Sequence, residues 1–481
     1  MIPDEDEARL RQLGYAQELR RMLGVVDNII VGLATISPVV ALYAVLQVGT
    51  ILAGPGWVWT LPISLLGQCL LLAVYAELAA LFPLAGGAYQ WTRRLAGPSY
   101  AWLTGWFAVC AYLVANTTIA YLAAPWALDL LGVQPTPGRL VAAAALFICA
   151  CSAINLRGIA TTHRVLKFGV AAEIIATIGV GIALLVAFRN QSPSLLETVK
   201  NESHAAQGTE FLAALAVAGW VFIGFDACVG VSEETRAASR NVPRALWWTL
   251  LSAGTVVILS AVAILLAHPA PADITSGDDT DPVATAVTTA LGPRAGKPFD
   301  VVVLVAFFAC GLAAQALTAR TIFSIARDDV LPGSAYLKRV NARQSPGAAL
   351  IVVTVVGCAG LLLALNSAAI GSIITFGTAM IYVVFLLIAW SALTTRIRGK
   401  DASGPLLRRS PAKIMINALA VVWLTFELVN IAWPRPELAP TGAPWYQIWA
   451  APLVISLAVA AGAAYLWLAK PQHKVPTDFT T

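Results

Sequence analysis

The sequence predicts an all-α polytopic membrane protein with twelve transmembrane helices. Of its 481 residues, 58% are hydrophobic and only 12% are charged, and the mean hydropathy is +0.76. Ordinary soluble domains carry about 25% charged residues. Apolar runs of about 20 residues, each long enough to cross a hydrocarbon core of ~30 Å, recur along the chain. We therefore expect a lipid bilayer to surround most of the chain.

Proline, glycine and charged residues bound the twelve expected spans. The spans cover approximately residues 25–50, 57–82, 99–130, 139–156, 165–188, 211–233, 244–267, 298–322, 347–365, 368–393, 413–433 and 446–469. With the N-terminus in the cytoplasm, 25 of the 31 lysines and arginines fall on the inner side, and none lies deep in the membrane. This bias follows the positive-inside rule. We expect a multi-pass protein of the cell (inner or plasma) membrane with both termini in the cytoplasm.

Several function classes lack their characteristic residues in this sequence. The basic residues lie between apolar runs and form no cluster that would bind nucleic acid. All seven cysteines fall within apolar runs, so the loops offer no disulfide framework or metal site. The four histidines are scattered, and neither HExxH nor GxSxG occurs. We expect no enzyme activity, cofactor, metal or nucleic-acid partner, and no cleaved signal peptide.

Two expected spans contain helix-breaking residues. In the first, "VGLATISPVVALY", Pro38 removes a backbone donor and biases Ser37 away from helix. In the sixth, "VAGWVFIGFDA", Gly219 and Gly224 flank the segment "WVFI". At 1.5 Å per residue, both interruptions lie near the bilayer midplane. Interrupted helices at corresponding places in two five-span halves indicate the binding site of a transporter.

Asp226 and Glu173 are acids in apolar runs, at a similar depth on the cytoplasmic side of the midplane. An ionised carboxylate there is costly without a basic partner, and the count of basic residues offers none. Each acid is therefore either protonated or meets a mobile cation, which makes both candidates for proton coupling. The alternative is a neutral carboxyl group bonded to a neighbouring helix. For Glu427, in span eleven, we favour a structural role.

Glu233 and Glu234 follow the sixth span at its inner end. They precede arginines at positions 236, 240 and 244, a four-residue spacing that lines one helix face. We expect an inner charge network or gate here.

Three motifs resemble the amino acid–polyamine–organocation transporter superfamily, near its amino acid/choline branch. They are "VYAELAALFPLAGGAYQWTRRLAG" (74–97), "WVFIGFDACVGVSEETRAASRNVPRA" (220–245) and "ALTARTIFSIARDDVLP" (316–332). The resemblance implies the LeuT-type fold, with two inverted five-helix repeats and two added helices. The expected parts are a cytoplasmic tail (1–24), the two repeats (25–188 and 211–393), helices eleven and twelve (413–469) and a cytoplasmic C-terminal tail (470–481).

The resemblance also implies a substrate site between spans one, three, six, eight and ten. Trp220 would be the aromatic gate, the Ile223 carbonyl a ligand of the substrate's ammonium, and Asp226 the proton-sensing acid. Glu173 stands where some proton-coupled relatives have lysine, and span one lacks the family's glycine-rich break. The expected substrate-binding residues are Thr35, Ile36, Ser37, Gly219, Trp220, Phe222, Ile223, Gly224, Asp226 and Gln315.

We therefore predict a secondary active transporter of an amino acid or related organic amine, coupled to protons and working by alternating access. The alternatives are a sodium-coupled or exchange transporter of a polyamine, choline or ethanolamine-like cation, and a passive channel or facilitator. A channel would need a continuous pore lining or a carbonyl filter of the TVGYG kind, and the sequence contains no such filter. A twelve-span sugar-porter fold would need a long loop after span six, where this loop is short.

Overall fold

The computed structural model describes residues 5–200, 204–365, 369–398, 410–435 and 444–474. Within these ranges the regular elements are helices, and one isolated parallel bridge joins Leu23 to Thr235. The longer helices are α2 (Val25–Ile36), α3 (Pro38–Ala53), α4 (Thr60–Leu81), α5 (Gly87–Ala96), α6 (Pro98–Leu130), α7 (Pro137–Asn155), α8 (Ile159–Ala187), α9 (His204–Ala218), α11 (Ala238–Ala267), α13 (Pro282–Leu291), α14 (Gly296–Ala326), α16 (Gly347–Gly360), α17 (Ala369–Arg398), α18 (Pro411–Ala432) and α20 (Ala450–Ala469). The short ones are α1 (Glu5–Gln12), η1 (Pro55–Trp59), η2 (Pro193–Glu197), η3 (Gly219–Phe222), α10 (Ala227–Gly230), η4 (Ser232–Glu234), α12 (Pro271–Ser276), η5 (Pro293–Ala295), α15 (Ser334–Leu337), η6 (Leu361–Leu365), α19 (Trp445–Ile448) and η8 (Pro471–His473).

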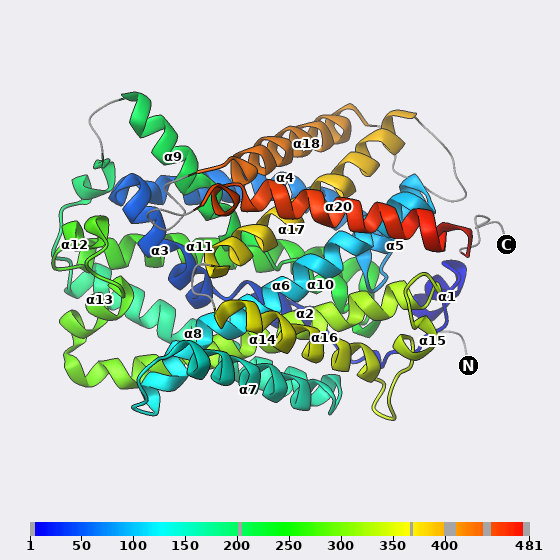
Figure 1. Cartoon of the computed structure of the whole chain (residues 1–481), viewed down its shortest axis with the longest axis horizontal. Coiled ribbons are helices and arrows are strands. Elements are labelled where there is room, and N and C mark those ends of the chain that lie inside the picture. The colour runs from blue at the N-terminus through cyan, green and yellow to red at the C-terminus, as the bar shows by residue number, and fades with distance from the viewer. Residues whose placement is uncertain (1–4, 201–203, 366–368, 399–409, 436–443, 475–481) are drawn as a thin grey trace.

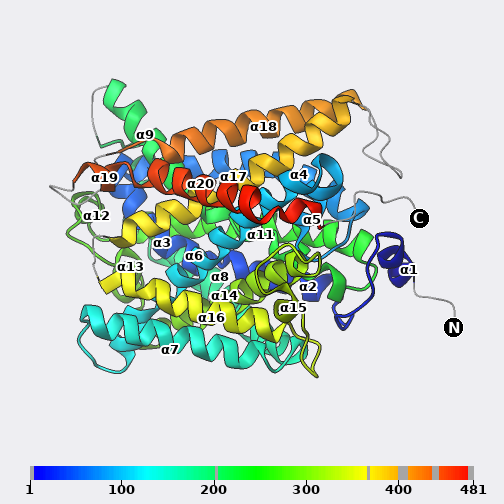
Figure 2. The same ribbon diagram turned by 45° about the vertical axis from the view of Figure 1, so that its right-hand side comes forward.

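Twelve stretches of helix in the described ranges are long and apolar enough to cross a membrane, which confirms the predicted number of spans. They run along one common direction (Figure 1). The helix α1 and the C-terminal end of α20 lie at the same end of the bundle, and α12 and α13 lie at the other (Figures 1 and 2). α1 and the end of α20 share one end of the bundle because an even number of crossings returns the chain to the side on which it started. We call these the α1 end and the α12 end.

The helix α6 packs against both α14 and α17 in the interior, whereas α7, α8 and α20 lie at the periphery. The peripheral helices expose large apolar side chains, among them Leu146, Ile175 and Leu457. In water such exposed apolar surface would be costly, but it is the normal surface of a helix in lipid. The bilayer is therefore the solvent that this arrangement requires.

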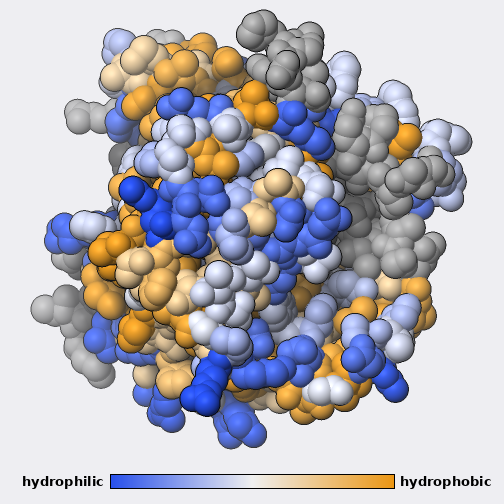
Figure 3. Space-filling model, turned by 90° about the vertical axis from the view of Figure 1, so that its left-hand side faces the viewer, coloured by the Kyte–Doolittle hydropathy of each residue, from blue (hydrophilic) through white to orange (hydrophobic). Residues whose placement is uncertain are grey.

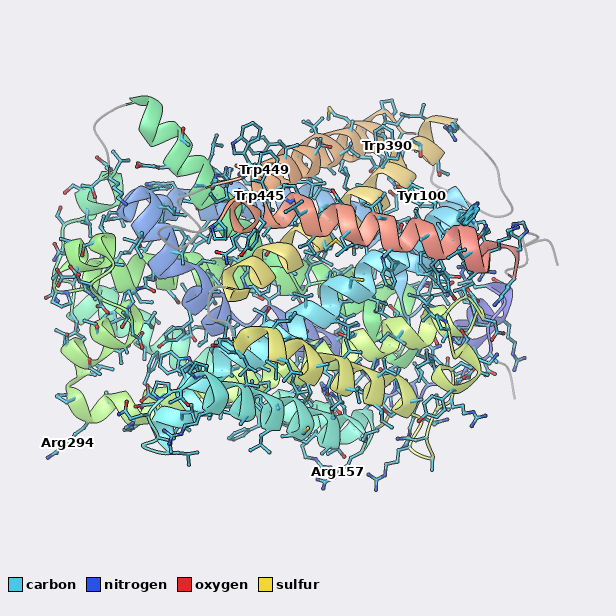
Figure 4. The ribbon with its side chains drawn as sticks, in the orientation of Figure 1. Tyr100, Arg157, Arg294, Trp390, Trp445 and Trp449 are labelled. Atoms are coloured by element: carbon cyan, nitrogen blue, oxygen red, sulfur yellow. The ribbon has the colours of Figure 1, made fainter. Side chains whose placement is uncertain are left out.

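Aromatic side chains that are exposed or half-buried lie toward both ends of the bundle. Trp445 and Trp449 lie nearer the α12 end, and Trp390 and Tyr100 lie nearer the α1 end (Figure 4). The three tryptophans are each at least half exposed. Tryptophan and tyrosine prefer the two membrane–water interfaces because their rings combine an apolar face with a polar group. Their positions fit a membrane whose normal follows the long axis of the bundle.

The α12 end carries a hydrogen-bonded cap formed by the segment between spans seven and eight. His268, at the end of α11, bonds Asp279 at 2.8 Å, and Gln47 of α3 donates to the Asp279 carbonyl at 2.9 Å. The Asp281 side chain accepts from the Ala284 N–H and so caps α13. Burial raises the pKa of Asp281 to about 6. Figure 3 shows this end face-on, with hydrophilic side chains over its middle.

A buried ion pair near the α1 end ties α17 and α18 to α4. The Arg396 guanidinium, which is fully buried, donates to the Glu77 carboxylate, and Lys413 donates to the same carboxylate at 2.7 Å. Lys413 is about half exposed. Losing the fully buried Arg396 removes the more desolvated of the two cations, which is more costly than losing the half-exposed Lys413.

We expect Arg396→Met to lower the free energy of unfolding by about 3–5 kcal/mol. Lys413→Met is the matched control, with an expected loss of about 0–1 kcal/mol because its charge is partly solvated. Thermal unfolding of the purified protein in detergent measures both. Equal losses from the two substitutions would contradict the assigned importance of the buried pair.

Candidate functional site

The first membrane span is broken at Ser37, between α2 and α3. Ser37 has φ 44° and ψ 98°, an unusual conformation for a residue with a side chain, and Pro38 begins α3. The Ser37 hydroxyl donates to the Glu173 carboxylate of α8 at 2.7 Å, and the Val39 N–H donates to the same oxygen at 2.9 Å. Glu173 is buried. The carboxylate therefore stabilises the break by accepting from two groups that the interrupted helix exposes.

The second break lies between η3 and α10, and it contacts the first. After η3 ends at Phe222, Ile223 is extended and Gly224 has φ +114°. A Cβ atom added at Gly224 would lie 3.0 Å from the Thr35 carbonyl carbon and 3.1 Å from the Ile36 nitrogen. Only glycine tolerates both this backbone angle and this close approach. The two interrupted helices thus touch backbone to backbone in the middle part of the bundle (Figure 1).

Asp226 follows the second break and is almost fully buried. The Tyr112 hydroxyl of α6 donates to Asp226 Oδ2. No hydrogen-bond partner within the described residues reaches Asp226 Oδ1. A buried carboxylate oxygen without a partner is unusual, because buried polar groups are nearly always bonded. Its free acceptor is available to a proton or to the ammonium group of a ligand.

A small cavity lies between the two breaks, α6 and α14. Its volume is about 50 Å³, well below the ~150 Å³ that accommodates a benzene ring. A ligand as large as benzene cannot fit until helices or side chains move. The lining residues are Thr35, Ile36, Val40, Tyr112, Ala115, Ile119, Trp220, Ile223, Gly224, Asp226, Cys310, Ala314 and Leu317.

Residues 22–458 match the amino acid permease family. The chain belongs to this family, within the amino acid–polyamine–organocation superfamily. Family members of this kind are transporters and not enzymes.

Curated relatives of this permease cover most of its length. It is 24% identical to amino-acid permease BAT1 of Arabidopsis thaliana, over 98% of this chain and 96% of the relative. It is 27% identical to the branched-chain amino acid permease BcaP of Lactococcus lactis subsp. cremoris, over 78% and 83%. It is 26% identical to the low-affinity putrescine importer PlaP of Escherichia coli, over 66% and 69%. The relatives thus include amino acid permeases and an amine importer.

Six of the ten predicted substrate-binding residues line the cavity of this permease, namely Thr35, Ile36, Trp220, Ile223, Gly224 and Asp226. Ser37 bonds Glu173 instead, and Gly219 accepts a hydrogen bond from Tyr382 through its carbonyl at 3.2 Å. Phe222 is fully buried in the hydrophobic core. Gln315 bonds Asn155 and Ser152, on α7, at 3.0 and 2.8 Å, so it connects α14 to α7.

Sequence reasoning missed the lining residues that α6 and α14 contribute. Tyr112 and Cys310 are the polar ones among them. Both lie inside long apolar runs, where no local pattern distinguishes the side that faces the breaks from the sides that face other helices. A tyrosine in the middle of a span was the available signal, because a buried hydroxyl needs a hydrogen-bond partner.

The acids at the inner mouth have different partners from those that their sequence neighbours suggested. Glu233 pairs with Arg327 at 2.6 Å, and Glu234 pairs with Arg320 at 2.8 Å, all four side chains being buried. Arg320 lies in α14 and Arg327 directly follows its last residue, whereas the sequence pointed to the arginines of the segment after Glu234. Arg320 is buried among the side chains around α14. The acids thus lock the sixth span to the eighth.

The N-terminal segment lies against these acids at the α1 end. The Met22 and Leu23 N–H groups both donate to the Glu234 carbonyl at 2.9 Å, and the Arg236 N–H donates to the Leu23 carbonyl. The Tyr15 hydroxyl donates to Asp328 at 2.9 Å. Burial raises the pKa of Tyr15, and the negative charge of Asp328 raises it further. This segment and the two ion pairs therefore lie together at the α1 end.

We expect Gly224→Ala to abolish substrate uptake, because its methyl group would push the two breaks apart. Gly97→Ala is the matched control: Gly97 has φ +95°, but nothing lies within 4 Å of an added Cβ. Both changes carry about 1–3 kcal/mol of backbone strain. Uptake in cells, corrected for the amount of folded protein, distinguishes them. A similar loss of uptake in both variants would contradict the importance of the contact between the breaks.

Proposed function

We propose that this permease is a secondary active transporter that moves an amino acid or related organic amine across the cell membrane by alternating access, coupled to protons. The observation that carries the proposal is the small cavity between two touching helix breaks, lined by a buried carboxylate with a free acceptor oxygen. Backbone interrupted at membrane depth is tolerated where it lines a site. The relatives that are named as amino acid permeases and as a putrescine importer support this substrate class.

The proposed architecture has two inverted five-helix repeats, 25–188 and 211–393, followed by helices in 413–469. The positions of the breaks support it, because each lies in the leading span of its repeat. The proposed orientation places the α1 end in the cytoplasm. Arg157, between spans four and five, and Arg294, between spans seven and eight, lie toward opposite ends of the bundle, as this alternation requires (Figure 4).

The proposed coupling groups are Asp226 and Glu173. Their described hydrogen-bond partners are Tyr112 for the first, and Ser37 with the Val39 N–H for the second. No lysine, arginine or histidine is among these partners. Tyr75 and Cys228 lie near Asp226, and Cys310 lies near Glu173, and these neighbours also carry no positive charge. A proton or a bound ammonium is therefore the available counter-charge for each acid.

Trp220, Glu233 and Glu234 are the proposed gates. Trp220 lines the cavity directly. The two acids close the α1 end through their pairs with Arg320 and Arg327. Opening toward the cytoplasm would require these buried pairs to separate and become hydrated.

Ligand screening of the purified protein tests the substrate class. Ligands that bind the folded form stabilise it and so raise the unfolding temperature. The stabilisation is about 2.7 kcal/mol when the ligand concentration is 100 times Kd. The compounds are amino acids, polyamines, ethanolamine and choline. We expect stabilisation by one or more of them, and a complete lack of response across the set would contradict the proposal.

We expect Asp226→Asn or Glu173→Gln to abolish pH-driven uptake of the best ligand into proteoliposomes while leaving some exchange. Each change removes the titratable group and keeps a polar side chain of the same shape. Glu427→Gln is the control, a buried acid on α18 away from the cavity, with uptake expected to remain pH-driven. Unchanged pH dependence in both site variants would exclude these acids from coupling.

We expect Trp220→Ala to weaken ligand binding roughly tenfold, because an indole face over an ammonium contributes about 1–2 kcal/mol. Trp248→Ala removes an equally large side chain from an exposed surface and should leave affinity unchanged. Binding isotherms of the folded variants measure the difference. Normal affinity and uptake in Trp220→Ala would assign Trp220 to packing alone.

A further inference from the structure

The N-terminus of α3 is already filled by the protein itself. The first four N–H groups of a helix have no partners within the helix, and together with the helix dipole they form an anion site. In α3, Pro38 has no N–H, and the Val39 N–H donates to Glu173 Oε1 at 2.9 Å. The Val40 N–H donates to the Ser37 hydroxyl at 3.4 Å, and the Ala41 N–H donates to the Ser37 carbonyl at 2.9 Å. No donor of this first turn remains for a ligand.

Glu173 also brings negative charge to this position. Its carboxylate lies on α8, is buried, and accepts from both Ser37 and Val39 through one oxygen. A second carboxylate placed beside the ionised Glu173 side chain would be repelled by its charge. An α-carboxylate of a substrate is therefore opposed by charge as well as by the lack of donors.

Three polar side chains of the cavity wall also use their hydrogen-bond donors inside the protein. The Thr35 hydroxyl donates to the Val31 carbonyl at 2.8 Å, and the Cys310 thiol donates to the Thr35 carbonyl at 3.3 Å. The Tyr112 hydroxyl donates to Asp226. These three donors are thus satisfied inside the protein, while Asp226 Oδ1 is a buried acceptor without a partner in the described residues. Among these four side chains, an acceptor is left for a cation and no donor is left for an anion.

We propose that the substrate is an organic amine without a carboxylate beside its amino group, and that Glu173 is the residue that excludes the carboxylate. This inference rests on the proposed transport function and narrows its substrate class. The ammonium group of the amine binds at Asp226. The Glu173 carboxylate occupies the helix terminus that would otherwise hold the carboxylate of an amino acid.

Matched pairs of compounds test the inference, because each pair differs only by the α-carboxylate. The pairs are putrescine and ornithine, 3-methylbutylamine and leucine, and phenethylamine and phenylalanine. Binding to the purified full-length protein is followed by the shift of its unfolding temperature with concentration. We expect the amine of at least one pair to bind, with at least tenfold higher affinity than its amino acid.

The outcomes separate this inference from the proposed function. If amino acids bind as tightly as their amines, or more tightly, the inference is overturned and the transporter proposal stands. If no compound of any pair binds, and none of the wider set does, both are overturned.

Substitutions of Glu173 test the assigned cause. Glu173→Ala frees the Val39 N–H and removes the charge, so the preference for the amine should fall at least tenfold. Glu173→Gln offers an amide oxygen to the same two donors but removes the charge, so the preference should fall by less than in Glu173→Ala. Glu427→Ala is the control for removing a buried acid and should leave the preference unchanged. An unchanged preference in Glu173→Ala would overturn the role of Glu173, and the wild-type pairs decide the substrate class if this variant does not fold.

Discussion

Backbone N–H and C=O groups inside a bilayer need partners, and this requirement determines the centre of the permease. An unbroken helix satisfies them internally, but the first and sixth spans are interrupted where no water of the bulk solvent reaches. The protein supplies the missing partners from neighbouring spans. Glu173 and Ser37 accept from the first turn of α3, and Gly224 lets the two interrupted backbones touch. The two breaks are therefore held in place by these contacts, and the small cavity lies between them.

Buried acids fall into two groups with different consequences. Glu233 pairs with Arg327, directly after α14, and Glu234 pairs with Arg320 of α14. Both pairs are buried, and breaking such a pair leaves a stranded charge. Such pairs fit the proposed gate, because they can separate only when water hydrates the freed charges. Asp226 and Glu173 have hydrogen-bond donors but no basic partner among the described contacts. Their charge can be balanced by a proton or a bound ammonium that arrives and leaves, and the proposed transport requires such an exchangeable partner.

The number of spans and the places of the two breaks could be predicted, because both depend on local composition. Apolar length identifies a span, and Pro38 or Gly224 disrupts a helix whatever its neighbours are. The partners of the charged groups could not be predicted in the same way. Glu234 has Arg236 close by in sequence, yet its buried partner is Arg320, more than eighty residues away. Proximity in sequence fails here because the bundle packs the sixth span against the eighth.

The sequence by itself determined that this chain crosses a membrane twelve times, that two of its spans are interrupted, and that two acids lie in apolar surroundings. These properties follow from the hydropathy and backbone chemistry of each residue. Only the tertiary structure decided what faces what: Tyr112 donates to Asp226, Glu173 fills the end of α3, and Gln315 lies between α14 and α7. An apolar helix carries little record of its orientation, because several of its sides are equally hydrophobic, so packing alone selects the side that forms the site.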